Sequence, residues 1–272
     1  MSSIEIRNLS FCYRSNAGSH LALENVSLSI SQGEFVCLVG HSGCGKSTLL
    51  SMLAGLEKPD KGGILVGGRE LSGPGTDRAM VFQHYSLFPW MTVGRNVAFS
   101  IEHSRKGREL PKAQVDELVR THLEQVGMGA DINRYPCELS GGMQQRVAIA
   151  RALAMDTDVL LLDEPFGALD ARNRQELQQL LLRLWQGSQP RKTVVFVTHD
   201  LSEAMLLADR IVFMRPRRIE RVISVPFERP RDADLLAADP AFRALRDELL
   251  GLFYLDEDEE PRAAGERGGA RE

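Results

Sequence analysis

The sequence predicts an α/β fold in which a mostly parallel sheet carries a phosphate-binding loop. Three apolar runs, at 35–39, 159–162 and 194–197, are typical of strands buried on both faces. Helical periodicity between such runs indicates the crossover connections that parallel strands need. Residues 4–6 and 26–30 instead alternate apolar and polar side chains, which indicates strands with one solvated face. These strands predict an N-terminal antiparallel β subdomain.

The middle and the end of the chain complete this organisation. Between 92 and 155 the periodicity is helical, which predicts a helical subdomain inserted into the core. Strand-like segments at 211–214 and 222–225 then precede a last helix. We therefore expect one domain over 1–252. Residues 253–272 become acidic and then rich in Gly, Arg and Ala, and we expect a disordered tail there.

Composition argues against several classes of protein. The 272 residues carry a net charge of −4, so charge alone does not recruit nucleic acid. The four cysteines lack metal-ligand spacing and are expected to be reduced thiols. No apolar stretch approaches the ~20 residues of a membrane-spanning helix. Any membrane role is therefore expected to depend on a partner.

The segment after the first apolar run matches a phosphate-binding loop, or P-loop. Its glycines let backbone N–H groups turn towards anionic oxygens, and the helix that starts at Lys46 adds its positive dipole end. Lys46 can neutralise β- and γ-phosphate charge, and the Ser47 hydroxyl can bind Mg²⁺. A P-loop NTPase core that binds a nucleoside triphosphate is therefore predicted. The candidate nucleotide-binding residues here are Gly40, His41, Ser42, Gly43, Cys44, Gly45, Lys46, Ser47 and Thr48.

Polar side chains follow the other apolar runs. Asp163 ends the second run, where it can hold Mg²⁺, and Glu164 can act as general base on the attacking water. Alone, these two acids are equally consistent with a helix cap and a turn. His199 follows the third run and is expected to contact the γ-phosphate. The uncharged amide oxygen of Gln83 can coordinate Mg²⁺ or the lytic water.

A second helix start has the character of an anion site. Ser140 is a natural N-cap, and Gly141 and Gly142 leave backbone N–H groups free at the start of a helical run. The chain thus has two anion-binding helix starts but one set of Mg²⁺ ligands. We therefore predict a composite site in which each nucleotide lies between two copies of the domain.

Together these motifs resemble the ATP-binding subunits of ABC transporters over about residues 1–252. Besides the P-loop and the acidic strand end, the resemblance rests on the hallmark Leu139-Ser140-Gly141-Gly142, the loop 167–170 and the switch histidine His199. It implies ATP as the nucleotide and Mg²⁺ as its metal. Tyr13 matches the family's adenine-stacking aromatic in position, with a half-buried strand aromatic as the alternative.

The resemblance also implies partners. Two copies would form a head-to-tail ATP-sandwich homodimer, in which Ser140 and Gly142 of one copy cap the γ-phosphate bound by the other. The loop at Gln83 would pass the motion of hydrolysis to integral membrane permease subunits. The apolar segment 87–91 is a candidate docking surface, with core packing as the alternative. A peripheral protein at the cytoplasmic face of the inner membrane is implied, served indirectly by a periplasmic or extracellular solute-binding protein.

Within the family, the segments 87–93, 140–146 and 198–204 resemble the nitrate/sulfonate/taurine importer branch. This implies an ATPase that powers uptake of nitrate, sulfonate, taurine or a similar small anion. The alternative is a soluble ABC ATPase acting on nucleic acid or ribosomes, but such proteins carry tandem cassettes or a long coiled coil. A P-loop kinase or small GTPase would lack the second helix start. No nucleic-acid partner is expected.

Overall fold

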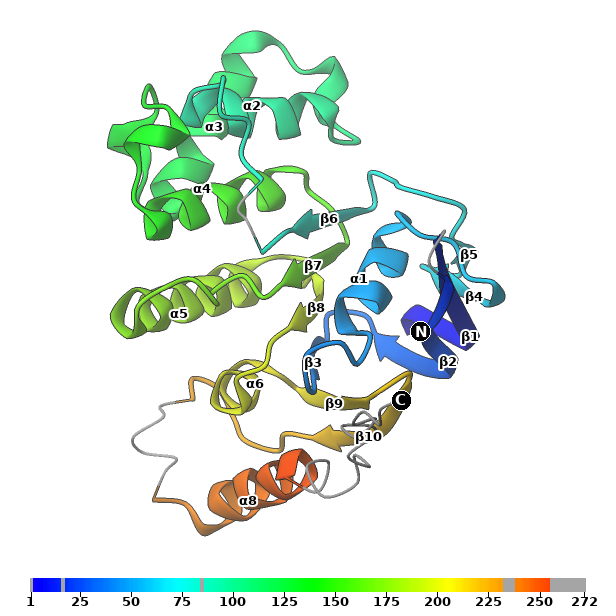
Figure 1. The fold of residues 1–272 in the computed structure, drawn as a ribbon. Helices are drawn as coiled ribbons and strands as arrows, with labels where there is room; N and C mark the ends of the chain where they lie inside the picture. The colour runs from blue at the N-terminus through cyan, green and yellow to red at the C-terminus, as the bar shows by residue number, and fades with distance from the viewer. Residues whose placement is uncertain (1, 16–17, 84–85, 232–237, 255–272) are drawn as a thin grey trace, which may run out of the picture. The chain divides into compact units, whose positions relative to one another are not determined.

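The structure is a computed structural model that describes residues 2–15, 18–83, 86–231 and 238–254. The chain divides into two compact units, Met1–Phe227 and Glu228–Glu272. The first contains both sheets, and the second contains helix α8 (Pro240–Tyr254) (Figure 1). The predicted domain over 1–252 spans this division and stays a prediction. The predicted tail lies outside the described residues, apart from its first two residues, which end α8.

Six strands form the mostly parallel sheet that the sequence predicts. Its order is β10-β9-β3-β8-β7-β6. All neighbouring strands are parallel except the edge pair of β9 and β10. Every residue of β3 and β8 is buried, which explains their continuous apolar sequences. The strands are β3 (Phe35–Val39), β6 (Arg78–Val81), β7 (Val159–Asp163), β8 (Thr193–Val197), β9 (Arg210–Arg215) and β10 (Arg218–Ser224).

A second sheet of four strands confirms the predicted antiparallel subdomain. Its order is β2-β1-β4-β5. The first two strands are much longer than the alternating segments that predicted them, because their pairing continues across register shifts near Asn8 and Asn25. These residues have φ angles of 45° and 50°. The strands are β1 (Ser2–Ser15), β2 (Gly18–Ser31), β4 (Lys61–Val66) and β5 (Arg69–Glu70).

Helix α1 (Lys46–Ala54) joins the two sheets through a shared hydrophobic core. Figure 1 shows it between β3 and the antiparallel sheet. Its Leu49, Leu50 and Leu53 are buried in one cluster with Ile6 of β1 and Val195 of β8. Burial of each leucine contributes roughly 1.5–3 kcal/mol. Since side chains from both sheets hold α1, the P-loop directly before it has a defined place.

Three helices form an insertion between β6 and β7. Figure 1 shows them grouped together beyond the β6 edge of the parallel sheet. Thr92 caps the first helix, where its hydroxyl accepts a hydrogen bond from the backbone N–H of Arg95. The helices are α2 (Val93–His103), α3 (Lys112–Gln125) and α4 (Gly141–Ala154), and 3₁₀ turns lie between them at Gly107–Glu109, Gly129–Asp131 and Pro136–Glu138.

Helices α5 (Ala171–Gly187) and α6 (Leu201–Leu207) follow β7 and β8 along the chain. Near the end of α5, Trp185 is 2% exposed and packs edge-on against Phe35 of β3, with ring centroids 5.4 Å apart. Its indole N–H donates to the carbonyl of Lys192 at 2.7 Å. A large aromatic side chain with its polar atom paired thus anchors α5 to the sheet.

Among the described residues, no helix combines the length and the apolarity that a bilayer crossing requires.

The two tryptophans of the chain offer a matched test of this packing. Trp185→Ala should lower the free energy of unfolding by about 3–5 kcal/mol, because it leaves a cavity beneath α5. Trp90 is 70% exposed, so Trp90→Ala should change the free energy of unfolding by less than about 0.5 kcal/mol. Urea titrations followed by far-UV circular dichroism measure both. Equal losses for the two variants would contradict the packing described for Trp185.

Candidate functional site

The P-loop lies between the end of β3 and the start of α1, and glycine is required at two of its positions. Gly40 and Gly45 have φ angles of 150° and 109°, which side chains other than hydrogen rarely permit. A Cβ at Gly40 would overlap the carbonyl oxygen of Met214, and one at Gly45 would lie 2.8 Å from that of Ala22. The loop can therefore curl only with glycine at both positions.

Lys46 is buried inside this loop. Its ammonium group donates to the carbonyl oxygens of Gly40 at 2.8 Å and His41 at 2.9 Å. The positive charge therefore lies within the curl of backbone from which N–H groups bind phosphate in loops of this kind. Arrival of an anion would replace two neutral acceptors with charged ones, which form stronger hydrogen bonds.

Ser47 and Asp163 come from different elements and meet beside the loop. The Ser47 hydroxyl, in the first turn of α1, donates to Asp163 Oδ1 at the end of β7 at 3.0 Å. Burial raises the pKa of Asp163, and the neighbouring charge of Glu164 raises it further. Hydroxyl and carboxylate oxygens suit Mg²⁺. No group of three or more His, Cys, Asp or Glu that could hold a metal occurs in the described part of the chain.

Glu164 and His199 also meet at this edge of the sheet. Nδ1 of His199 lies 3.2 Å from Oε2 of Glu164. Glu164 has a φ angle of 42°, and its N–H donates to the carbonyl of Val197 in β8 at 3.0 Å. A non-glycine residue in this left-handed conformation is uncommon and often marks a functional position. The histidine side chain is 63% exposed, so a ligand can reach it.

Tyr13 and Gln83 lie at the margins of this cluster. The Tyr13 hydroxyl is 3.3 Å from the Thr48 hydroxyl in α1, and the tyrosine is 42% exposed. The ring is therefore open to stack with a planar group beside the start of α1. Gln83 is exposed just past β6, which pairs with β7, the strand that ends in Asp163.

The thiol of Cys44 lies in the same loop but has no sign of a reactive role. It is 1% exposed. Burial raises its pKa, and this outweighs the opposing effect of the Lys46 charge. Cys44 is therefore a neutral packing group beneath the loop.

The second predicted anion site is set apart from the P-loop within one chain. Ser140 caps α4, and its hydroxyl accepts a hydrogen bond from the N–H of Met143 at 3.4 Å. Gly141 and Gly142 form the first turn of that helix. Figure 1 shows the start of α4 within the helical insertion, away from α1, the helix that directly follows the P-loop along the chain. The structure thus brings together the residues at the ends of β3, β7 and β8 but not Ser140 and the P-loop.

Sequence reasoning missed Asn96, which shapes the candidate docking segment 87–91. This fully buried side chain accepts a hydrogen bond from the Phe88 N–H at 2.8 Å. It also donates to the carbonyls of Phe88, Met91 and Thr92 at 3.0–3.2 Å. Asn96 thereby holds the turn in which Trp90 points into solvent. A polar amide on the apolar side of a predicted helix was the one signal that could have revealed it.

Core packing, the alternative reading of that segment, is only partly correct. Phe88 is half-buried against Phe99, with ring centroids 5.0 Å apart, and the Arg151 guanidinium lies 5.5 Å from its ring centroid. Trp90, however, is 70% exposed and contacts Phe88 with ring centroids 5.6 Å apart. A large exposed indole on an otherwise fixed turn is typical of a contact surface.

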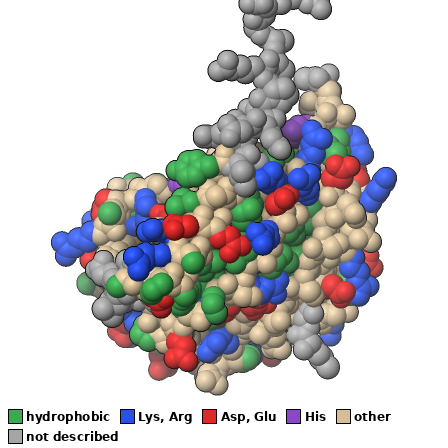
Figure 2. Space-filling view, turned by 90° about the horizontal axis from the view of Figure 1, so that it is seen from below, with side chains coloured by type: hydrophobic (Ala, Val, Ile, Leu, Met, Phe, Trp, Pro, Cys, Tyr) green, Lys and Arg blue, Asp and Glu red, His purple; other side chains and the backbone are tan. Residues whose placement is uncertain are grey.

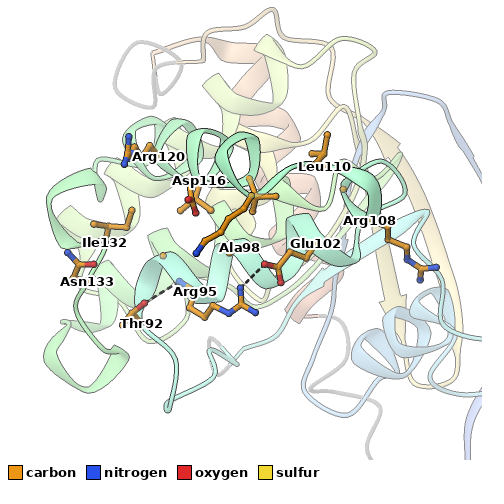
Figure 3. Close-up of a pocket in the computed structure, with 15 residues that line it drawn as sticks. Thr92, Arg95, Ala98, Glu102, Arg108, Leu110, Asp116, Arg120, Ile132 and Asn133 are labelled. Carbon is orange, nitrogen blue, oxygen red and sulfur yellow. Dashed lines mark hydrogen bonds and ion pairs between the residues drawn. The ribbon is translucent and has the colours of Figure 1, made fainter.

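A hollow of about 630 Å³ lies in the helical insertion, between α2 and α3. Figure 3 shows its charged wall, where Arg95 pairs with Glu102 at 2.6 Å. Its floor is apolar, with Ala98 and Ile132 among its residues. None of the predicted site residues lines it. Its charged residues are Arg95, Glu102, Arg108, Lys112, Asp116 and Arg120.

Sequence reasoning also missed Glu203, a buried acid on α6 close to His199. Its Oε1 accepts a hydrogen bond from Gln178 of α5 at 2.9 Å. Burial raises its pKa, although hydrogen bonds from Thr198 and Gln178 act in the opposite direction. Only the tertiary structure shows this burial, because Glu203 occupies the first turn of an otherwise ordinary helix.

Comparison with known proteins identifies the family of this chain. Residues 23–167 match the family model described as ABC transporter. The chain is 44% identical over 256 residues to the bicarbonate transport ATP-binding protein CmpD of Synechocystis, covering 92% of this chain and 89% of that protein. It is 46% identical over 240 residues to the nitrate import ATP-binding protein NrtD of Synechococcus elongatus, covering 87% and 86%. It is 44% identical over 264 residues to the nitrate transport protein NasD of Klebsiella oxytoca, covering 96% and 98%.

A solved structure is similar over most of the chain. It is a dimeric ATP-binding cassette in a post-hydrolysis state, bound to ADP and Pi. The TM-score is 0.74 at 32% sequence identity, with 83% of this chain and all of that chain covered. Together with the P-loop and the acidic strand end, these similarities identify the protein as an ATPase with a P-loop NTPase core. The chain belongs to the ABC transporter family.

The buried acid Glu203 predicts how stability depends on pH. Because the folded pKa is raised above its ordinary value of 4.5, the folded chain holds this proton more tightly than the unfolded chain does. The stability that the protonated carboxyl contributes is complete below pH 4.5 and is lost as the pH rises through the folded pKa. Glu203→Gln cannot titrate, so its stability relative to wild type should increase over that window.

Urea midpoints between about pH 4 and pH 8 measure this difference. The exposed Glu70→Gln, which also replaces a carboxyl group by an amide, provides the matched control. A Glu203→Gln difference from wild type that does not change with pH would contradict the raised pKa.

Proposed function

We propose that this chain is the ATP-hydrolysing subunit that powers uptake of a small anion through a membrane ABC importer. The observation that carries the proposal is the meeting of two polar pairs beside the P-loop. These pairs are Ser47 with Asp163 at 3.0 Å and Glu164 with His199 at 3.2 Å. They supply the parts that phosphoryl transfer to water requires: a phosphate cradle, metal ligands, a base and a polar group for the γ-phosphate.

The nucleotide-binding roles are assigned residue by residue. The P-loop backbone from Gly40 to Gly45 and the Lys46 ammonium would hold the phosphates, and Tyr13 would stack on the adenine. Ser47 and Asp163 would hold Mg²⁺, with Gln83 as a further oxygen ligand. A metal held there would supply positive charge against the phosphates.

Glu164 is the proposed general base. Its left-handed conformation places the carboxylate at the edge of the sheet, past the last buried residue of β7. It would take a proton from the attacking water, while His199 would donate a hydrogen bond to the γ-phosphate. The 3.2 Å contact between them would keep both groups at the same phosphate. Burial of the neighbouring strand end strengthens these electrostatic interactions.

The complete site requires a second copy. Within one chain the free N–H groups at Ser140, Gly141 and Gly142 are set apart from the P-loop, so they are available to a nucleotide held by another molecule. The similar solved cassette is a dimer. We therefore propose the head-to-tail ATP-sandwich homodimer, in which each α4 start caps the γ-phosphate at the partner's P-loop.

Coupling to the membrane would use the fixed turn around Trp90 and the adjacent loop at Gln83. The exposed indole offers a hot-spot anchor for integral membrane permease subunits. The protein would then lie at the cytoplasmic face of the membrane as a peripheral subunit. A solute-binding protein would deliver the solute from the opposite side. The relatives named for nitrate and bicarbonate support a small anion as cargo, and the alternative of a nucleic-acid or ribosome partner is not favoured.

Glu164→Gln tests the catalytic proposal. The amide keeps the shape of the side chain but cannot accept the proton from water, so ATP turnover should fall by about a hundredfold or more. MgATP binding should be retained, and ATP-bound dimer should accumulate on size exclusion. Glu70→Gln, at an exposed position of β5, is the matched control and should keep full turnover. Wild-type turnover of Glu164→Gln would remove Glu164 from the role of base.

Trp90→Ala tests the docking proposal. Loss of a hot-spot indole should weaken binding to the proposed membrane permease subunits about 30-fold, which corresponds to about 2 kcal/mol. ATPase activity of the isolated cassette should stay within about twofold. Co-purification of the complex measures the first effect, and Tyr254→Ala, which changes another exposed aromatic residue, is the control. Unchanged co-purification would place the docking surface elsewhere.

The same complex in lipid vesicles, with its solute-binding protein, tests the cargo. ATP-dependent accumulation of labelled nitrate, bicarbonate or taurine would support the anion class. Accumulation of none of them, in a complex that hydrolyses ATP, would contradict it.

A further inference from the structure

The loop that carries His199 and the helix α6 that follows it contact α5 through two side-chain pairs. Arg174 and Gln178 are four residues apart on α5 and so lie on one face of the helix. The Arg174 guanidinium lies 3.6 Å from Asp200 Oδ2. One turn further along, Gln178 donates to Glu203 in a buried hydrogen bond of 2.9 Å. Asp200 is the N-cap of α6, directly after His199, and Glu203 lies in the first turn of that helix.

Asp200 connects this attachment to the backbone around His199. Its Oδ1 accepts hydrogen bonds from the N–H groups of Ser202 at 2.9 Å and Glu203 at 3.2 Å, which caps α6. Its own N–H donates to the Thr198 hydroxyl at 3.0 Å. One carboxylate oxygen therefore orients the helix, and the other faces Arg174. Movement of Asp200 would displace His199, which lies between Thr198 and Asp200.

Arg174 also binds a second loop, the one that follows Glu164. Its Nη2 donates to the carbonyl of Leu169 at 3.1 Å. Leu169 belongs to the loop 167–170, which begins where the Gly167 N–H donates to the carbonyl of Glu164 at 3.2 Å. A single guanidinium thus connects the loop that follows Glu164 to the loop of His199. The side chains of Arg174, Glu164 and His199 line one small cavity.

We propose that Arg174 is a positioning residue, which sets the contact between Glu164 and His199 by holding both of their loops. This proposal rests on the proposed catalytic roles of those two residues. The planar guanidinium can bind two acceptors at a fixed angle, whereas an ammonium group is a single point charge. In the described part of the chain its Nε is buried without a hydrogen-bond partner, so the two terminal nitrogens alone hold the group.

Arg174→Met tests this role through the separation of kcat from KM. Turnover should fall about tenfold to a hundredfold, because displacement of catalytic groups by about 1 Å has effects of this size. KM and the Kd for MgATP should stay within about twofold, since Arg174 binds neither P-loop nor candidate metal ligand. The control is Arg172→Met. Arg172 lies on the same helix, and its 89% exposed side chain pairs with Glu176. It should retain wild-type kcat.

A double-mutant cycle with His199→Ala separates positioning from general stability. If Arg174 acts through His199, adding Arg174→Met to His199→Ala should reduce kcat by less than about twofold further. The Arg174 proposal would be overturned if the kcat losses of the two single variants multiply in the double variant. It would also be overturned if Arg174→Met keeps wild-type kcat per folded molecule. Neither outcome would affect the proposed role of His199. Wild-type turnover of His199→Ala would remove the proposed role of His199 and with it this proposal.

A conservative variant keeps the proposal testable if Arg174→Met does not fold. Arg174→Lys retains the charge beside Asp200 but cannot hold the Leu169 carbonyl at the same time. Its kcat should lie between those of wild type and His199→Ala, with KM unchanged. Wild-type kcat in Arg174→Lys would show that the link between the two loops is not needed for turnover.

Discussion

In-register pairing of the parallel strands β3, β7 and β8 is the constraint on which the whole site depends. Val197, at the end of β8, lies opposite Leu38 of β3 and Asp163 of β7. Two further backbone bonds extend the pairing past the strands, from Thr198 to Leu38 at 3.2 Å and from Glu164 to Val197 at 3.0 Å. Three loops therefore leave the sheet at one level. Because the strands are buried and cannot slip without exposing apolar side chains, this alignment is robust.

The charges gathered at this edge support the proposed binding of a metal-bound polyphosphate. A buried ammonium, Lys46, lies on one side, and the carboxylates of Asp163 and Glu164 lie on the other. Burial raises the pKa of Asp163, which means that its ionised form is costly without a nearby cation. Bound cation and phosphate would therefore each compensate a charge that the fold has desolvated. The same burial makes the Cys44 thiol inert despite its place near a helix start.

Two polar side chains outside the phosphate loop hold loop segments in place. Arg174 holds the loops of Glu164 and His199, and Asn96 holds the turn that exposes Trp90. Each binds backbone carbonyls, which fixes loop conformation more directly than side-chain packing does. The proposed catalytic edge and the proposed membrane contact are thus both supported by hydrogen bonds inside one compact unit.

Local patterns in the sequence determined the fold class and the candidate P-loop, acidic and histidine positions. These patterns are local: the spacing of glycines, continuous apolar strands and the polar residues that follow them. The structure places Lys46, Asp163 and His199 at one edge of the sheet, as such patterns require. The sequence alone could not determine the full length of β1 and β2, which depends on pairing across register shifts. It also could not reveal Arg174 or Glu203, because their partners are distant in sequence and only tertiary packing brings the two helices together.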